Sequence, residues 1–353
     1  MQESVEKGLE KEILEKVNPL QLEETPSFEK DQFNALFEQL SQSIESFQTK
    51  LREGKGTKKP WHVFGEAKQA FLREHPLVVE EKEDQRRQTL LVEAILEAPR
   101  GLFEQEFKLA VFEEQKKQAR NPKDRESIAN QEKKVKEESA SWQHRIAAFI
   151  LIHRDNPEIN IETHMRDFWQ RLGALEEIVM PDVLRKSRKE QGETKSMAEA
   201  AREGIARVVT ATDVLRDAGF MTYLPTAFYD REYGHDFYAT PRGELPEGVQ
   251  RPLYAFQIKP LKFDGKGPLY IEKANAESSS IAEERAEIYK VASGLRKLRN
   301  ENTATIGKRK LGAVYVEVPV GPTWPGISPA TGSADEAFRL PAARDLDKRL
   351  KIE

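Results

Sequence analysis

Tyr233-Gly-His-Asp-Phe-Tyr-Ala239 is followed, after a turn rich in proline and glycine, by Tyr254-Ala-Phe-Gln-Ile-Lys259, and both stretches have the composition of β-strands. In the second stretch the side chains alternate, so the apolar residues face one way while Gln257 and Lys259 share the opposite face. If the two strands pair in register, Asp236 lies beside them. An acid next to a Gln-x-Lys pattern is one way in which a metal-dependent site for cleaving phosphodiesters is built. The simpler interpretation is a polar strand face wetted by solvent, with the lysine near an edge.

The composition of the chain excludes several classes of protein and of functional site. The chain has 353 residues, which favours two domains with ample material for a core, and 33% of its residues are charged. A mean hydropathy of −0.69 with 17 Phe and 4 Trp is typical of a soluble globular protein rather than of a disordered one. The net charge of −4 gives no overall basic signature. The absence of cysteine excludes disulfides, thiolate metal sites and cysteine nucleophiles.

Residues 1–27 form an acidic, amphipathic segment with an apolar stripe at four-residue steps, rather than a basic region before an apolar run. A secretory signal is therefore not expected. The longest apolar run, residues 146–152, is far shorter than the roughly 20 residues that a membrane helix needs. We therefore expect no membrane partner and a cytoplasmic location.

Residues 28–184 have the periodicity of a helical domain. Apolar residues recur at steps of three and four, and prolines mark the boundaries because proline disfavours a helical conformation in the residue before it. The expected helices cover residues 33–51, 61–74, 77–96, 102–118, 124–153 and 161–184. Residues 185–196 contain no apolar side chain, which predicts a linker between two domains.

Residues 197–320 change periodicity repeatedly, which is typical of an α/β domain. The expected order is a helix at 197–218 that ends at Gly219, strands at 221–228, 235–240, 253–259 and 269–272, a helix at 281–299 and a strand at 311–318. A helix that leads back to a further strand implies a mixed sheet with helices packed on it. Residues 321–353 are predicted to form a Pro/Gly-rich tail. The fold class is therefore α+β overall, with an all-helical domain followed by an α/β domain whose small mixed sheet is flanked by helices.

This order, with Asp236 on the second strand and the Gln-x-Lys pattern on the third, resembles the core of the PD-(D/E)xK nuclease superfamily and its restriction-endonuclease-like fold. The resemblance covers residues 197–320 and none of the helical region. Within it, Asp236 matches the family's metal-binding aspartate and Lys259 its lysine. Gln257 stands where the family usually has Asp or Glu. The family often adds a glutamate on the first helix, and Glu203 is available there.

The resemblance implies a hydrolase that cleaves phosphodiester bonds in nucleic acid with Mg²⁺ or Mn²⁺, as an endonuclease or an exonuclease. Mg²⁺ takes oxygen ligands, which Asp236, the amide oxygen of Gln257 and the backbone carbonyl of Ile258 would provide. A metal-bound water would have a lowered pKa, and Lys259 would orient this water or stabilise charge in the transition state. Because Gln257 is a neutral ligand, weakened or absent activity is part of the expectation.

Charge is distributed unevenly along the chain. Residues 196–320 carry 18 Lys and Arg against 17 Asp and Glu, whereas residues 1–195 carry 33 against 38. This mild contrast places any contact with nucleic acid on the C-terminal domain. Arg296 on the last helix and the run Lys308, Arg309 and Lys310 after it could meet phosphates without reading bases. The alternative for each residue is a solvated helix face balanced by nearby glutamates.

Two functional classes remain open from the sequence. The first is a metal-dependent nuclease, or a catalytically weakened relative, whose helical domain recruits a protein partner or a substrate. The second is a non-enzymatic binding protein in which the helical domain binds the partner and the α/β domain is a scaffold, since a fold does not by itself imply an activity. A helical binding module predicts an exposed apolar groove, whereas a nuclease predicts convergence of Asp236, Lys259 and a second carboxylate.

Overall fold

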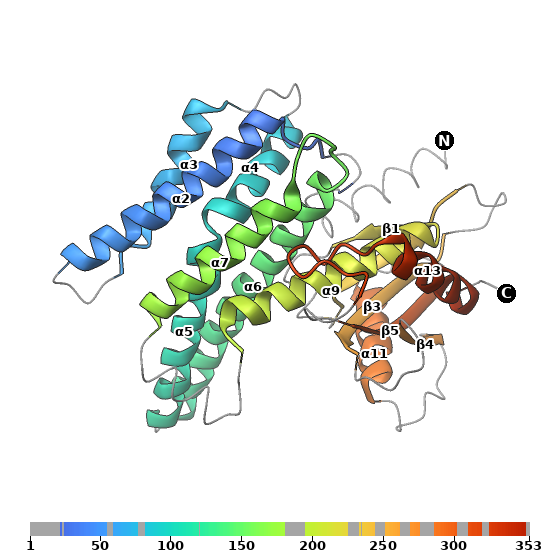
Figure 1. Cartoon of the computed structure of the whole chain (residues 1–353). Coiled ribbons are helices and arrows are strands. Elements are labelled where there is room, and N and C mark those ends of the chain that lie inside the picture. The colour runs from blue at the N-terminus through green and yellow to red at the C-terminus, as the bar shows by residue number, and fades with distance from the viewer. Residues whose placement is uncertain are drawn as a thin grey trace. The chain divides into compact units, whose positions relative to one another are not determined.

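The computed structural model of the chain (Figure 1) describes residues 22, 25–54, 59–76, 82–119, 121–180, 195–224, 233, 235–243, 251–261, 269–275, 286–301, 310–319 and 325–350. The chain divides into two compact units, Glu23–Gly204 and Ile205–Glu353 with Met1–Leu22. The division falls inside helix α9 (Met197–Asp217). The apolar stripe expected near the N-terminus and most of the linker expected at 185–196 lie outside the described residues.

Helices α2 to α7 build the first unit, called here the helical unit. Their bounds are Lys30–Glu53 (α2), His62–Glu74 (α3), Lys82–Leu96 (α4), Ala98–Gln118 (α5), Pro122–His153 (α6) and Ile161–Val179 (α7). Each of these helices overlaps one that the periodicity predicts. None of the helices in the described ranges is long and apolar enough to cross a membrane.

Helix α5 starts earlier than the sequence predicts. Pro99 lies in its first turn, where proline costs no hydrogen bond because the first N–H groups of a helix have no acceptor within it. Gly101 lies inside the helix, where Trp142 of α6 packs against it. A Cβ at this position would come within 2.1 Å of the indole ring, so the contact requires glycine. Pro99 therefore lies close to the predicted boundary, since α4 ends at Leu96 and α5 begins at Ala98, whereas Gly101 reflects a close packing contact within α5.

A buried histidine joins the start of the helical unit to α6. The Nδ1–H of His153 donates to the carbonyl of Phe149 (2.8 Å), and its Nε2 accepts the backbone N–H of Phe28 (3.1 Å). An N–H donor facing Nε2 selects the neutral tautomer with the proton on Nδ1. Burial lowers the pKa of His153 to about 4. The ring is therefore neutral at pH 7 and acts as a structural bridge.

The start of α9 is held by a buried carboxylate from α7. Glu176 accepts the backbone N–H groups of Met197 (2.7 Å) and Ala198 (2.9 Å), which lack acceptors inside the helix. A negative charge at a helix N-terminus also interacts favourably with the helix dipole. As the sequence predicts, α9 is followed by Gly219, whose φ of 83° is a conformation that glycine adopts at little cost.

The second unit, called here the sheet unit, contains a five-stranded mixed sheet in its described residues. The strands are β1 (Phe220–Tyr223), β2 (Phe237–Pro241), β3 (Leu253–Pro260), β4 (Tyr270–Asn275) and β5 (Leu311–Val318). Their order is β1-β2-β3-β5-β4, in which β3 and β5 are parallel and the other neighbours are antiparallel. Helix α11 (Ala286–Glu301) precedes β5 and forms part of the crossover from β3. The predicted α+β class with a small mixed sheet is confirmed.

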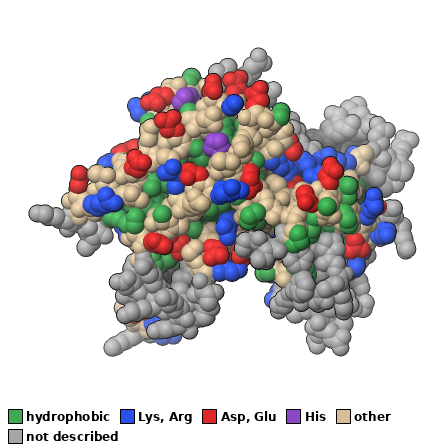
Figure 2. All heavy atoms as spheres, viewed as in Figure 1, with side chains coloured by type: hydrophobic (Ala, Val, Ile, Leu, Met, Phe, Trp, Pro, Cys, Tyr) green, Lys and Arg blue, Asp and Glu red, His purple; other side chains and the backbone are tan. Residues whose placement is uncertain are grey.

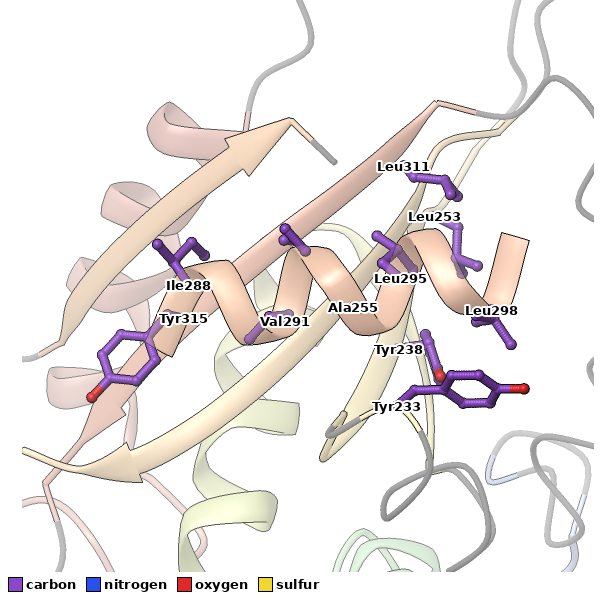
Figure 3. Packing of buried hydrophobic residues seen from close by; sticks show 12 residues of the cluster. Tyr233, Tyr238, Leu253, Ala255, Ile288, Val291, Leu295, Leu298, Leu311 and Tyr315 are labelled. Carbon is purple, nitrogen blue, oxygen red and sulfur yellow. The ribbon is translucent and has the colours of Figure 1, made fainter. Parts of the chain in front are cut away.

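Helix α11 covers one face of this sheet (Figure 3). The shared core comprises Tyr233, Tyr238, Leu253, Ala255, Ile288, Val291, Ala292, Leu295, Leu298, Leu311, Ala313 and Tyr315. The odd-numbered residues of β3 and β5 therefore face α11, and the even-numbered residues face the other way. Gln257 and Lys259 are at odd-numbered positions and so lie on the face that α11 covers.

The C-terminal residues form helix α13 (Glu336–Leu350), where the sequence predicts a Pro/Gly-rich tail. Buried residues recur along it at four-residue steps, namely Phe338, Ala342, Leu346 and Leu350. The hydroxyl of Tyr254 donates to the carbonyl of Leu350 (3.2 Å), which ties the end of α13 to β3. The prediction fails because Pro341 lies within the helix and disguises an otherwise regular apolar stripe.

Candidate functional site

Asp236 is fixed against β3 at the point where β2 begins. Its backbone N–H donates to the carbonyl of Phe256 (2.8 Å), and its carboxylate accepts the backbone N–H of Ile258. β2 starts at the next residue, Phe237, which pairs with Phe256. The carboxylate therefore takes the place of a strand partner for Ile258. In this way the structure brings Asp236 into direct contact with the Gln-x-Lys segment.

The residue before the aspartate is a fully buried histidine. The Nε2–H of His235 donates to the carbonyl of Val291 on α11 (3.0 Å), and its Nδ1 accepts the hydroxyl of Tyr238 (2.8 Å). Because a carbonyl can only accept, the ring proton is on Nε2. Burial lowers the pKa of His235 to about 4. A neutral ring therefore ties the chain just before Asp236 to α11.

Gly294 of α11 allows this close approach. A Cβ at Gly294 would lie 1.9 Å from the carbonyl oxygen of Tyr233 and 3.0 Å from Nε2 of His235. The hydroxyl of Tyr233 donates to Glu301 (2.6 Å), and its ring lies 5.7 Å from the ammonium of Lys297. The segment is therefore docked along α11, and the position of the aspartate follows from this docking.

Gln257 and Lys259 project from β3 on the face that α11 covers. The Oε1 of Gln257 is buried and has no hydrogen-bond partner among the described residues. Buried amide oxygens normally accept a hydrogen bond, and leaving one unsatisfied costs about 1–3 kcal/mol. Lys259 is half-buried two residues further along the strand. An unsatisfied oxygen beside a lysine and near a fixed carboxylate is suited to hold a water or a cation.

β5 adds two polar residues to the same face. In the parallel pair of β3 and β5, Tyr315 is the partner of Gln257 and Glu317 is the partner of Lys259. The hydroxyl of Tyr315 donates to the carboxylate of Glu317 (3.0 Å). Figure 3 shows Tyr315 next to Ile288 at one end of the shared core, with its hydroxyl directed away from that core. A second carboxylate is therefore present one strand away from the Gln-x-Lys pattern.

Sequence reasoning misses Tyr315 and Glu317 as site residues. The stretch Leu311–Val318 has the composition of a buried strand, and the pattern does not reveal which strand lies beside it. A signal was available, because two polar side chains spaced by two near the end of an apolar strand indicate a shared polar face.

The acid expected from the first helix is engaged elsewhere. Glu203 belongs to the helical unit, where both of its carboxylate oxygens accept from the ammonium of Lys195 (2.6 and 2.7 Å). Among the described residues, no three His, Asp or Glu side chains are gathered to hold a metal ion. The donors at Asp236 and its neighbours are instead one carboxylate, one amide oxygen and one backbone carbonyl. All three are oxygens, and this donor set fits a hard cation such as Mg²⁺ or Mn²⁺.

Of the basic residues expected to meet phosphates, Arg296 and Lys310 are described. Lys310 immediately precedes β5, seven residues before Glu317, which corresponds to roughly 23 Å along an extended strand. Arg296 lies in the second half of α11, which packs over the N-terminal ends of β3 and β5 (Figure 3). Lys308 and Arg309 lie outside the described residues. A phosphate contact at Lys310 would therefore lie far from Glu317.

Comparison with known proteins adds no assignment to these observations. No protein-family model, no curated protein and no solved structure matches the chain. Function is therefore inferred from the residues and their geometry alone.

Proposed function

We propose that the sheet unit is a nuclease-like domain that hydrolyses phosphodiester bonds in nucleic acid with Mg²⁺ or Mn²⁺. The order α9, β1, β2, β3, α11 and β5 supports the proposal, because it is the order on which the resemblance to the PD-(D/E)xK superfamily rests. β4 is an additional strand at the edge of the sheet. The aspartate precedes β2 by one residue, and the Gln-x-Lys pattern lies within β3.

The contact of Asp236 with β3 is the observation that supports the proposal most. Its carboxylate accepts the N–H of Ile258. The N–H and C=O of one residue in a strand point to the same edge, so the carbonyl of Ile258 is directed to the side on which Asp236 lies. Two oxygen donors are thus directed to one place by the backbone. The buried Oε1 of Gln257 supplies a third on the adjoining face.

Each residue of the set would have a distinct role. Asp236, the carbonyl of Ile258 and the amide oxygen of Gln257 would hold the cation, and Asp236 alone among these three carries charge. A bound cation supplies a water of lowered pKa and neutralises charge on the scissile phosphate. The ammonium of Lys259 would orient the attacking water or stabilise the charge that develops on the phosphate. The neutral Gln257 predicts weak metal binding and slow cleavage.

A non-enzymatic binding protein is the second candidate, and the engagement of Glu203 with Lys195 favours it by removing one expected acid. A helical docking module also needs exposed apolar surface. In the described part of the helical unit, the large apolar residues that are well exposed are Val111 on α5 and Ile178 on α7. Charges of both signs are interspersed on the face shown in Figure 2. The described surface therefore gives the apolar docking role little support, and the nuclease-like proposal is preferred.

Cleavage by the full-length chain tests the proposal. Labelled single-stranded and double-stranded DNA and RNA are incubated with the protein and Mg²⁺, Mn²⁺ or EDTA. We expect slow cleavage that requires the metal. Asp236→Asn and Lys259→Met should each lower the rate at least about 100-fold, because a charged group at the reacting phosphate is lost.

Matched controls use the same residue types at exposed positions. Asp124→Asn on α6 and Lys290→Met on α11 should leave the rate within about twofold of wild type, since exposed substitutions seldom disturb a fold. Thermal unfolding of every variant should resemble that of wild type. The proposal fails if wild type cleaves no substrate with either metal, or if Asp236→Asn cleaves as well as wild type does.

A further inference from the structure

We propose that Glu317, on β5, supplies the second carboxylate of the candidate metal site. It would replace the Asp or Glu that the superfamily usually has at the position of Gln257. The inference rests on the proposed function. It concerns a residue that the resemblance does not assign, and it follows from the register of β3 and β5.

The register places Glu317 on the correct face. β3 and β5 are parallel, and Glu317 is the partner of Lys259, while Tyr315 is the partner of Gln257. Side chains at paired positions leave the same face of a sheet about 5 Å apart. Lys259 therefore has Glu317 beside it on β5, while Asp236, just before β2, is level with Gln257 on the other side of β3.

The carboxylate of Glu317 is held in place. It accepts the hydroxyl of Tyr315 (3.0 Å), and Tyr315 is itself buried in the core shared with α11. Figure 3 shows Tyr315 beside Ile288 at one end of this core. A hydrogen bond from a packed tyrosine restricts the glutamate rotamers and lowers the entropy that binding would cost.

The span between the two acids is one that a cation can bridge. Asp236 lies just before β2, level with Gln257, whereas Glu317 lies level with Lys259 on β5, on the other side of β3. Their backbones are therefore about 12 Å apart, at roughly 4.8 Å per strand across the sheet and roughly 3.3 Å per residue along it. Two metal–oxygen bonds of about 2.1 Å, together with extended aspartate and glutamate side chains, span about this distance. The Oε1 of Gln257 lies on the intervening strand, where it would face the same ion.

Glu272 provides a matched control. It lies on β4, where it is paired with Tyr315, and it is half-buried, as Glu317 is. β4 is one strand further from β2 than β5 is. Glu272 is therefore an acid of comparable exposure that is too remote to share an ion with Asp236.

Mn²⁺ binding to the full-length chain, measured by titration calorimetry, tests the inference without depending on cleavage. Glu317→Gln should weaken Mn²⁺ binding at least about tenfold, because affinity follows the number of charged ligands. Glu272→Gln should leave it within about twofold. Adding Gln257→Glu to Glu317→Gln should recover most of the loss, since the charge is returned to the neighbouring strand. Tyr315→Phe should weaken binding about threefold by releasing the glutamate while retaining the ring.

The outcomes separate this inference from the function on which it rests. If Asp236→Asn weakens Mn²⁺ binding but Glu317→Gln binds as wild type does, the inference is wrong and the proposed function stands. If wild type binds no Mn²⁺, or Asp236→Asn binds as well as wild type does, the proposed function is wrong and the inference falls with it. If Glu317→Gln fails to fold, Tyr315→Phe decides, and unchanged Mn²⁺ affinity in that variant overturns the inference.

Discussion

The helical unit and the sheet unit each bury one neutral histidine, yet only one of them places a candidate site beside it. In the helical unit, His153 lies among phenylalanine rings, with its centroid 4.9 Å from that of Phe28 and 4.3 Å from that of Phe149. In the sheet unit, His235 is held by a tyrosine hydroxyl and a helix carbonyl, and the next residue is Asp236. The same kind of hydrogen-bonded bridge joins two core segments in the helical unit and positions the segment that carries a carboxylate in the sheet unit. A buried histidine therefore indicates function only through what its neighbours carry.

Each unit has a helix glycine at a very close packing contact, Gly101 in the helical unit and Gly294 in the sheet unit. Substitutions at these two positions should have the largest effects on stability. Gly294→Ala would force the carbonyl of Tyr233, and with it His235, away from α11. Gly101→Ala would collide with the ring of Trp142. Overpacking against such fixed groups should cost about 3 kcal/mol of unfolding free energy in each case.

Hydrogen exchange followed by mass spectrometry can assign each loss to a unit. Gly294→Ala should raise exchange in the sheet unit and abolish Mn²⁺ binding, because Asp236 moves with the docked segment. Gly101→Ala should raise exchange in the helical unit and leave Mn²⁺ binding unchanged. Equal exchange changes in both units for either variant would show that the contrast between the units is mistaken.

Both histidines should make stability depend on pH in the same direction. Burial lowers the pKa of His153 and of His235 to about 4, whereas an unfolded histidine has a pKa of about 6.5. Between these values the unfolded state binds a proton that the folded state does not, so stability is lost as the pH falls from 6.5 to 4. Each histidine should remove up to about 3 kcal/mol over this window, at about 1.4 kcal/mol per pH unit.

Urea unfolding at pH 7.5, 5.5 and 4.5 measures this dependence. His153→Gln should flatten it for the helical unit only, and His235→Gln for the sheet unit only, because neither glutamine takes up a proton in this range. A pH dependence that both variants retain in full would mean that other groups cause it and that the two histidines are not buried neutral bridges.

Each unit also has a carboxylate that accepts backbone N–H groups, Glu176 in the helical unit and Asp236 in the sheet unit. Their substitution should change stability less than that of the glycines or the histidines. Glu176 accepts the first two N–H groups of α9, so Glu176→Gln should cost about 1–2 kcal/mol of unfolding free energy through loss of a charged cap. Asp236 accepts one N–H at a strand end, so Asp236→Asn should cost less than about 1 kcal/mol while it abolishes Mn²⁺ binding. Urea unfolding and calorimetry of both variants give the two readouts. A larger stability loss in Asp236→Asn than in Glu176→Gln would assign Asp236 to the fold rather than to a site.

The elements that sequence predicts best are those whose signals are local. β5 occupies the predicted range, and Gly219 ends α9 as its conformational freedom suggests. Misleading signals came from residues whose role depends on a distant partner. Gly101 indicates a break between helices, yet it lies inside α5 and accommodates Trp142. Local pattern cannot distinguish a glycine that breaks a helix from one that admits an indole ring.

Sequence could predict only those residues of the candidate site that lie on β3 or just before β2. Alternation within β3 puts Gln257 and Lys259 on one face, and the chain just before β2 supplies Asp236. The placement of Glu317 required knowledge that β5, and not β4, lies beside β3. Sheet order is set by the crossover through α11 and by packing against it, which no short stretch of sequence specifies.

Mn²⁺ binding by Gln257→Glu tests most directly whether the polar face of β3 is a metal site. Calorimetry on wild type and on this variant compares a neutral and a charged ligand at the buried oxygen that lacks a hydrogen-bond partner among the described residues. If the face is a metal site, Gln257→Glu should bind Mn²⁺ at least about tenfold more tightly than wild type, because affinity follows ligand charge. It should also cleave nucleic acid faster at limiting metal. Unchanged Mn²⁺ affinity in a variant that remains folded would contradict the account and leave Asp236, Gln257 and Lys259 as a polar strand face without a metal.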